Sequence, residues 1–205
     1  FQSSYDNIQR NSFETILEPN NQITTRLLTQ NAAAATIRGI EAEFQWIPID
    51  GLLISGLIGT LDARYDKCPD AVDARGGAVP IDRSGERFIR TPKYNTFLAA
   101  QYSIPLSISG WAGGYLTPRV EWAYRAEEMF AEAEIPEARQ AGYGLVNARI
   151  SYDFLGDQAQ IALWGRNLGD KRYANIVVPI VGPMGILVKG YGAPRTFGAE
   201  LTYTF

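Results

Sequence analysis

The strongest constraint on this chain is a strict alternation of apolar and other residues that recurs in several long segments. In the closing stretch "PRTFGAELTYTF", every second residue is apolar, and threonine, glycine and glutamate fill the positions between. The apolar members are Phe197, Ala199, Leu201, Tyr203 and Phe205. Because successive side chains of a strand point to opposite faces, the segment predicts a strand with one apolar face. A soluble β-sandwich and a membrane barrel both use such strands.

Three further segments repeat the alternation. Their apolar positions are Ile40, Ala42, Phe44 and Trp46; Leu116, Val120, Trp122 and Tyr124; and Val146, Ala148, Ile150, Tyr152 and Phe154. The positions between them hold most of the charged residues of these segments. The segment 51–65 is apolar on both parities, so the sequence leaves its orientation open.

The connections between the expected strands alternate in length. We expect strands at about 1–10, 33–48, 51–65, 89–104, 113–128, 141–154, 158–173 and 194–205. Short turns fall at Asp50-Gly51 and 155–158, with a somewhat longer one at 105–112. The long connections are 11–32, 66–88, 129–140 and 174–193. Short turns at one end of long strands and long loops at the other are typical of an outer-membrane barrel.

Composition agrees with this interpretation and excludes several functions. Hydrophobic residues make up 46% of the chain and charged residues 20%, which suits a barrel because only every second strand residue must be apolar. The absence of histidine and the single cysteine exclude His-based catalysis, His/Cys metal sites and a disulfide within the chain. A net charge of -3 gives no indication of a nucleic-acid surface.

Aromatic residues are expected at two heights of the predicted barrel. Trp46, Tyr102, Trp111, Tyr152, Phe154, Tyr203 and Phe205 fall near the short-turn end, and Tyr65, Tyr94, Tyr124, Tyr143 and Tyr173 near the long-loop end. Two such girdles mark the membrane–water interfaces of a barrel. The alternative is that aromatic residues simply favour strands.

Several motifs together resemble one known family. "NAAAATIRGIEAEF" (31–44), "GLLISGLIGTLDARY" (51–65), "YGLVNARISY" (143–152) and "ALWGRNLGDKRY" (162–173) precede the closing strand with its terminal phenylalanine. In this order and spacing they resemble the TonB-dependent outer-membrane receptors. The resemblance covers essentially the whole chain. It matches the chain to the C-terminal third of their barrel domain.

The resemblance implies an all-β, antiparallel, up-and-down barrel of 22 strands in the outer membrane of a Gram-negative bacterium. It implies no enzyme activity, no cofactor and no metal, but uptake of a scarce extracellular nutrient such as a ferric siderophore, cobalamin or a saccharide. The plug domain, the N-terminal strands and the segment that contacts TonB would belong to a longer chain, of which residues 1–205 are a fragment or the ordered part.

Two alternatives stay open at this stage. Eight strands can close into a self-contained small barrel with a structural or adhesion role, but its interior holds only its own side chains. The third hypothesis is a soluble all-β binding protein of the lipocalin type, or an enzyme on such a barrel.

Charged residues of the polar faces are the first candidate site. The positions expected to face the lumen are Glu41, Glu43, Arg119, Glu121, Arg149, Arg166 and Glu200. An unpaired buried charge is costly, so we expect these residues to form ion pairs against each other or the plug. Direct contact with a ligand is the alternative role.

The apolar loop 174–193 is the second candidate site. An exposed apolar patch usually contacts something, so we expect ligand contacts or packing on neighbouring loops. The residues concerned are Ile176, Val178, Ile180, Met184, Ile186 and Tyr191.

The loop 66–77 offers two further possibilities. Its carboxylates Asp66, Asp70 and Asp73 are hard oxygen ligands of the kind that calcium binds, but their spacing matches no standard calcium loop, and we expect a solvated loop without metal. For Cys68, a disulfide with a cysteine outside the chain and a lone thiol both remain open.

The C-terminal strand carries a testable function. The resemblance implies that the barrel-assembly machinery recognises Tyr203 and Phe205 at the end of the closing strand. Phe205→Asp combined with Tyr203→Ser should therefore strongly reduce receptor at the cell surface. A charge on the lipid face near an interface costs only about 0–1 kcal/mol, so a severe loss indicates failed recognition. Normal surface labelling of the double variant would rule the assembly signal out.

Overall fold

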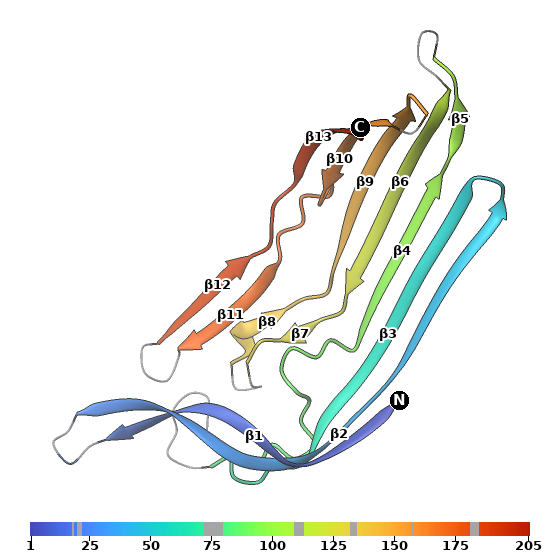
Figure 1. The fold of residues 1–205 in the computed structure, drawn as a ribbon. Helices are drawn as coiled ribbons and strands as arrows, with labels where there is room; N and C mark the ends of the chain where they lie inside the picture. Colours follow the sequence, from blue (N-terminus) through green and yellow to red (C-terminus); the bar gives the residue numbers. More distant parts are fainter. Residues whose placement is uncertain are drawn as a thin grey trace.

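The protein is an antiparallel β-sheet in which the strands follow one another along the chain (Figure 1). The computed structural model describes residues 1–17, 19, 22–71, 80–108, 113–131, 135–156, 158–180 and 185–205. Eight strands form the path β1-β2-β3-β4-β6-β9-β10-β13. Their bounds are β1 Gln2–Leu17, β2 Ile23–Ile49, β3 Leu52–Lys67, β4 Tyr94–Tyr102, β6 Gly114–Arg125, β9 Tyr143–Phe154, β10 Ala159–Arg166 and β13 Thr196–Tyr203. The short β5, Ile104–Leu106, pairs with β6.

The path confirms the expected all-β meander, but three of the predicted long connections contain paired strands. β1 and β2 continue as a paired ribbon through most of the predicted connection 11–32, and the ribbon bends away from the sheet (Figure 1). The predicted loop 174–193 contains a hairpin of β11, Ala174–Ile180, and β12, Ile186–Tyr191.

A second small hairpin lies in the 126–140 connection. It joins β7, Glu128–Met129, to β8, Arg139–Gln140. The 3-10 helix η1, Pro136–Ala138, precedes β8. Pro136 lies in the first turn of this helix, where a backbone N–H would have no partner within the helix, so proline costs no hydrogen bond there. Within the part of the chain that the structure describes, no helix is long and apolar enough to cross a membrane.

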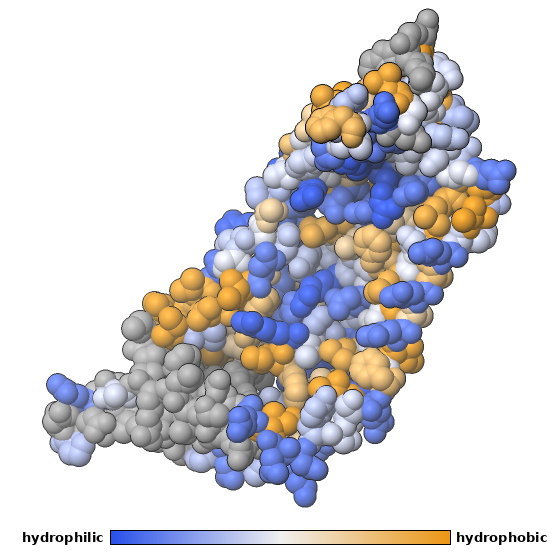
Figure 2. Space-filling model, in the orientation of Figure 1, coloured by the Kyte–Doolittle hydropathy of each residue, from blue (hydrophilic) through white to orange (hydrophobic). Residues whose placement is uncertain are grey.

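Strand register separates the sheet into one charged face and one apolar face. Paired residues share a face, and Glu41 lies opposite Gly59 on β3, whereas its neighbour Ile40 lies opposite Thr60. The apolar face is highly exposed in this chain: Ile40 is 70% and Leu201 73% accessible. Hydrophilic residues instead gather in the middle of the face seen in Figure 2.

Register also orients β3, which the sequence left open. Ile54 and Ile58 pair with Trp46 and Ala42 of the apolar face. Leu57 pairs with Glu43 on one side and with Phe97 on the other, so it lies on the charged face. β3 therefore carries apolar residues on both of its faces, although only one of them belongs to the apolar face of the sheet.

The aromatic residues follow the same division, with three exceptions. Tyr94 and Tyr124 stack on the apolar face, with ring centroids 5.6 Å apart. Tyr65, by contrast, lies on the charged face, where it is 8% accessible and packs on Phe88. Tyr143 pairs with Arg125 of the same charged face and stacks on Tyr173, with ring centroids 4.4 Å apart, so the girdle prediction is wrong for these three tyrosines. Trp111 lies outside the described residues.

The described strands form an open sheet. β1 pairs with β2 alone and β13 with β10 alone among them, so each edge presents unpaired backbone groups. In hydrocarbon each unpaired group costs several kcal/mol, and only closed barrels avoid this cost. The edges of this sheet therefore need further strands before it can span a membrane.

Glycines let aromatic rings lie flat on the neighbouring strand. Gly198 is paired with Trp164, and a Cβ at Gly198 would overlap the indole ring. On the apolar face, a Cβ at Gly56 would overlap the ring of its partner Phe44 in the same way. Such aromatic–glycine pairs pin the register of adjacent strands.

Gly198→Ala is expected to destabilise the barrel by about 1–3 kcal/mol, because the added methyl group forces the indole out of place. Gly59→Ala is the matched control, since its Cβ would meet only Glu41 Cγ at 3.9 Å and the substitution reduces unfolded-state entropy. The measurement is the temperature at which the full receptor loses its heat-modifiable gel migration. Equal shifts for the two variants would contradict the role given to the ring.

Candidate functional site on the charged face

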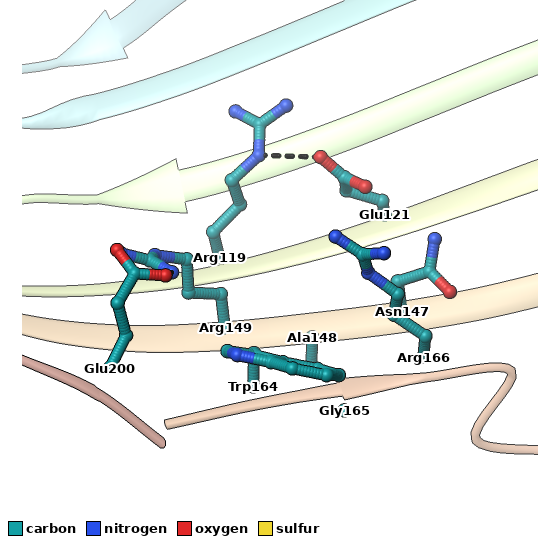
Figure 3. A pocket seen from close by; sticks show the side chains of 9 residues that line it. All are labelled: Arg119, Glu121, Asn147, Ala148, Arg149, Trp164, Gly165, Arg166 and Glu200. Carbon is teal, nitrogen blue, oxygen red and sulfur yellow. Dashed lines mark hydrogen bonds and ion pairs between the residues drawn. The ribbon is translucent and has the colours of Figure 1, made fainter. Parts of the chain in front are cut away.

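Four adjacent strands bring the candidate site together. β6 contributes Arg119 and Glu121, β9 contributes Arg149, β10 contributes Arg166, and β13 contributes Glu200 (Figure 3). They converge because register places Arg119 opposite Arg149 and Arg149 opposite Trp164. The alternation that predicted each strand's polar face therefore also builds one continuous polar surface.

Two arginines organise this surface. Arg119 donates to Glu121 Oε1 from Nε at 2.8 Å and to Gln101 on β4 at 2.7 Å. Arg149 donates to both carboxylate oxygens of Glu200 at 3.2 Å and to Gln160 Oε1 at 2.8 Å. Arg119 thus links β6 to β4, and Arg149 links β9 to β10 and β13.

The hydrogen-bonded chain continues past the arginines. Gln160 Nε2 donates to Asp153 Oδ1 at 2.6 Å. Arg166 lies over the Trp164 ring, with Cζ 5.1 Å from the ring centroid. Asn147 completes the lining of a hollow of about 230 Å³, which is smaller than the about 300–1,000 Å³ of ordinary small-molecule sites. The hollow therefore suits water or part of a ligand.

The two remaining candidate charges lie apart from this group. Glu41 and Glu43 lie on β2, and Glu43 lines a separate hollow with Gln45, Ser55 and Phe97. Five of the seven predicted residues are thus brought together and two are not. Trp164, Gln101, Gln160 and Asn147 are not among the predicted site residues, although each has the parity of the charged face.

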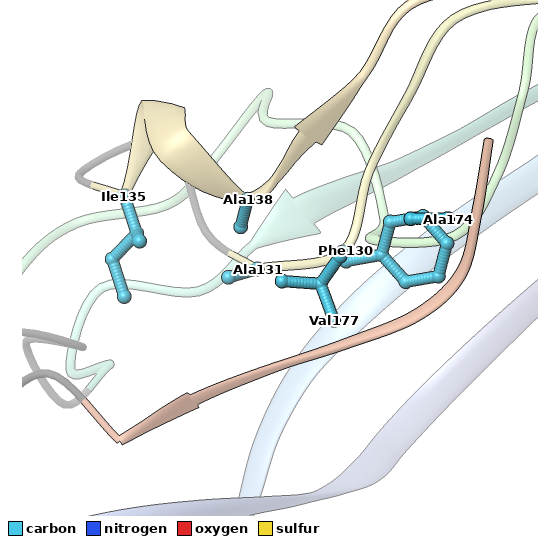
Figure 4. Packing of buried hydrophobic residues seen from close by; sticks show 6 residues of the cluster. All are labelled: Phe130, Ala131, Ile135, Ala138, Ala174 and Val177. Atoms are coloured by element: carbon cyan, nitrogen blue, oxygen red, sulfur yellow. The ribbon is translucent and has the colours of Figure 1, made fainter. Parts of the chain in front are cut away.

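The inner side of the β11–β12 hairpin forms part of a small core (Figure 4). Val177 is 1% accessible and packs in a buried cluster with Phe130, Ile135 and Ala174, against which Leu187 also packs. The two loop hairpins are therefore held on each other by apolar contacts outside the main sheet.

The outer side of the same hairpin is aliphatic and accessible. Val178 pairs with Val188, and Ile180 with Ile186, so these side chains share the face that Val177 does not. Ile176, on the same side, is 43% accessible, whereas Tyr191 pairs with Ala174 and shares the parity of Leu187 on the inner side, although it is 49% accessible. Arg172 lies over the Tyr191 ring at 4.0 Å. Met184 lies outside the described residues.

The remaining predicted positions take structural places. Asp66 accepts a hydrogen bond from Thr36 Oγ1 at 2.7 Å, and no cluster of three metal-ligating residues occurs among the described residues; Asp73 lies outside them. Cys68 is fully buried with Ala35, Tyr65 and Ala71, which favours a packing role. Tyr203 and Phe205 are exposed, with ring centroids 5.9 Å apart.

Comparison with known proteins identifies the family. Residues 1–168 match the family described as TonB dependent receptor-like, beta-barrel. The match covers most of the chain, and the protein therefore belongs to this family of outer-membrane transporters, which are not enzymes. No curated protein sequence shows significant similarity to the chain.

Solved structures show the same fold. The ferric yersiniabactin uptake receptor FyuA from Yersinia pestis superimposes with a TM-score of 0.68 at 18% identity, over 87% of this chain and 25% of FyuA. The siderophore receptor PiuA from Acinetobacter baumannii gives 0.65 at 17%, over 98% and 25%. The ferric-catecholate import receptor Fiu from E. coli K12 gives 0.63 at 14%, over 100% and 24%.

The chain thus spans about a quarter of the length of these receptors. This explains the open edges of the sheet, because the eight strands correspond to part of a larger barrel. The predicted fold class, family and outer-membrane location are confirmed.

Proposed function

We propose that residues 1–205 form the C-terminal part of the barrel of a receptor that takes up a scarce nutrient with energy delivered by TonB. A ferric siderophore, cobalamin or a saccharide is the proposed nutrient class. The first strands of the same receptor complete the wall of the barrel, and the plug fills it. TonB acts through the N-terminal region. Family membership and the fold shared with siderophore receptors support the proposal.

The observation that carries the proposal is the ion-paired polar face of the sheet. Arg119 and Arg149 are engaged by Glu121 and Glu200, so the two arginines at its centre are charge-compensated within the sheet. Such a surface can pack against a polar plug and release it again, because exposed ion pairs contribute only about 0–1 kcal/mol each. A transport path needs this reversibility, whereas a tight binding site does not.

We place the first ligand contact on the outer side of the β11–β12 hairpin. The hairpin belongs to a long-loop connection, where a nutrient arrives from outside. Its inner side is already occupied by packing on Phe130 and Ile135. The two roles considered for this loop therefore fall on opposite sides of the hairpin.

The uptake test uses cells that lack the chromosomal receptor and carry it on a plasmid. Radiolabelled ferric siderophores, cobalamin and an oligosaccharide are supplied in turn. We expect one class to enter only in cells that hold both the receptor and TonB. Receptor-dependent uptake that persists without TonB, or no uptake of any of these classes, would refute the proposal.

Replacing Ile176, Val178, Ile180 and Ile186 with serine should weaken nutrient binding by at least about tenfold. Burial of one aliphatic side chain is worth roughly 1.5–3 kcal/mol, and about 1.4 kcal/mol corresponds to tenfold in affinity. Val177→Ser is the matched control on the inner side: it should make the loop sensitive to protease. Binding is measured by titration on whole cells. Unchanged affinity of the quadruple variant would remove the hairpin from the binding site.

A further inference from the structure

A basic cluster lies on the apolar face of the sheet, near the loop end of β3 and beside the middle of β2. Arg38 pairs with Asp62, two residues beyond the Ile40–Thr60 pair of the apolar face. Arg64 follows Asp62 on the same face of β3. Arg87 forms an antiparallel bridge with Arg64, which places it beside them. These charges point away from the lumen side, unlike those of the candidate site.

Asp62 holds the three arginines together. Its Oδ2 accepts from Arg38 Nη2 at 3.1 Å, and its Oδ1 accepts from Arg64 Nε at 2.9 Å and from Arg87 Nη1 at 2.6 Å. Arg87 Nη2 also donates to Leu61 O at 2.7 Å, and Arg64 Nη1 donates to Gly85 O at 3.0 Å. The guanidinium groups are therefore positioned before any ligand arrives.

The cluster keeps excess positive charge and accessible donors. Three arginines face Asp62, and the next acid on this face, Asp66, accepts from Thr36, so these described residues sum to +1. The Arg38 and Arg64 side chains are 65% and 47% accessible. Each guanidinium has five N–H donors, of which Asp62 and the carbonyls use only some.

The height of the cluster matches a lipid headgroup. Tyr94 pairs with Thr60 and stacks on Tyr124, and tyrosine rings on a lipid-facing surface sit at the membrane–water interface. Asp62 is two residues further out along β3, about 7 Å from Thr60. The arginines therefore lie just beyond the aromatic row, where lipid phosphates are found.

We propose that Arg38, Arg64 and Arg87 bind the phosphate group of an anionic lipid in the outer leaflet of the outer membrane. The planar guanidinium fork matches phosphate oxygens, and basic clusters next to a membrane recognise anionic lipids. Asp62 orients the three side chains and limits their affinity, because the lipid phosphate must share the arginines with it.

The test uses the purified full receptor in nonionic detergent, titrated with lipopolysaccharide and with its dephosphorylated form. The double variant Arg38→Gln/Arg64→Gln should bind lipopolysaccharide about 25-fold more weakly, since each basic residue at a membrane surface contributes roughly fivefold. Asp62→Asn should bind it more tightly. Lys171→Gln/Lys189→Gln removes the same charge from exposed loop positions and should leave the affinity unchanged.

The outcomes separate the proposal from its alternatives. Equal affinity of the wild type and the double variant, or equal binding of dephosphorylated lipid, would overturn it. Competition by inorganic phosphate alone, with the same dependence on Arg38 and Arg64, would assign the site to a soluble anion. Heat-modifiable migration reports folding, and the single variant Arg38→Gln, at the most exposed of the three arginines, carries the test if the double variant does not fold.

Discussion

Every feature of this chain depends on the backbone hydrogen bonds between antiparallel strands. In a bilayer no water satisfies a free N–H or C=O, so strands must pair on both edges around a closed barrel. The path from β1 to β13 satisfies that condition for all but the two edge strands. The same pairing fixes register, and a shift of one residue would move every side chain to the opposite face.

Strand register then determines which side chains lie on each face of the sheet. Along β2, Glu41 and Glu43 fall on the charged face while Ile40 and Phe44 fall on the apolar face. The same alternation places Arg38 on the apolar face, opposite Asp62. The face that we propose for transport and the arginines that we propose for lipid binding therefore arise from adjacent residues of the same strands, and the aromatic row of Tyr94 and Tyr124 lies next to the arginines.

The sequence was enough to predict which face of a strand is polar when the strand alternates clearly. It was not enough when the orientation of a strand depends on pairing with its neighbour. The polar face of 141–154 and its arginine Arg149 could be read directly. The orientation of β3 could not, because both parities are apolar and only pairing with Trp46 and Ala42 fixes it. Tyr65 was misplaced for the same reason. The β11–β12 hairpin was predicted as a loop, since its prolines and glycines mask a strand pattern whose inner side is defined by contact with Phe130.

The assignment of the two faces can be measured directly with spin labels on β2. In a Cys68→Ser background, single cysteines placed from Ile40 to Phe44 in the membrane-embedded receptor report collision with oxygen, which partitions into lipid, or with a water-soluble nickel complex. The account predicts oxygen maxima at Ile40, Ala42 and Phe44 and nickel maxima at Glu41 and Glu43. A flat profile, or maxima on the reversed parity, would contradict it.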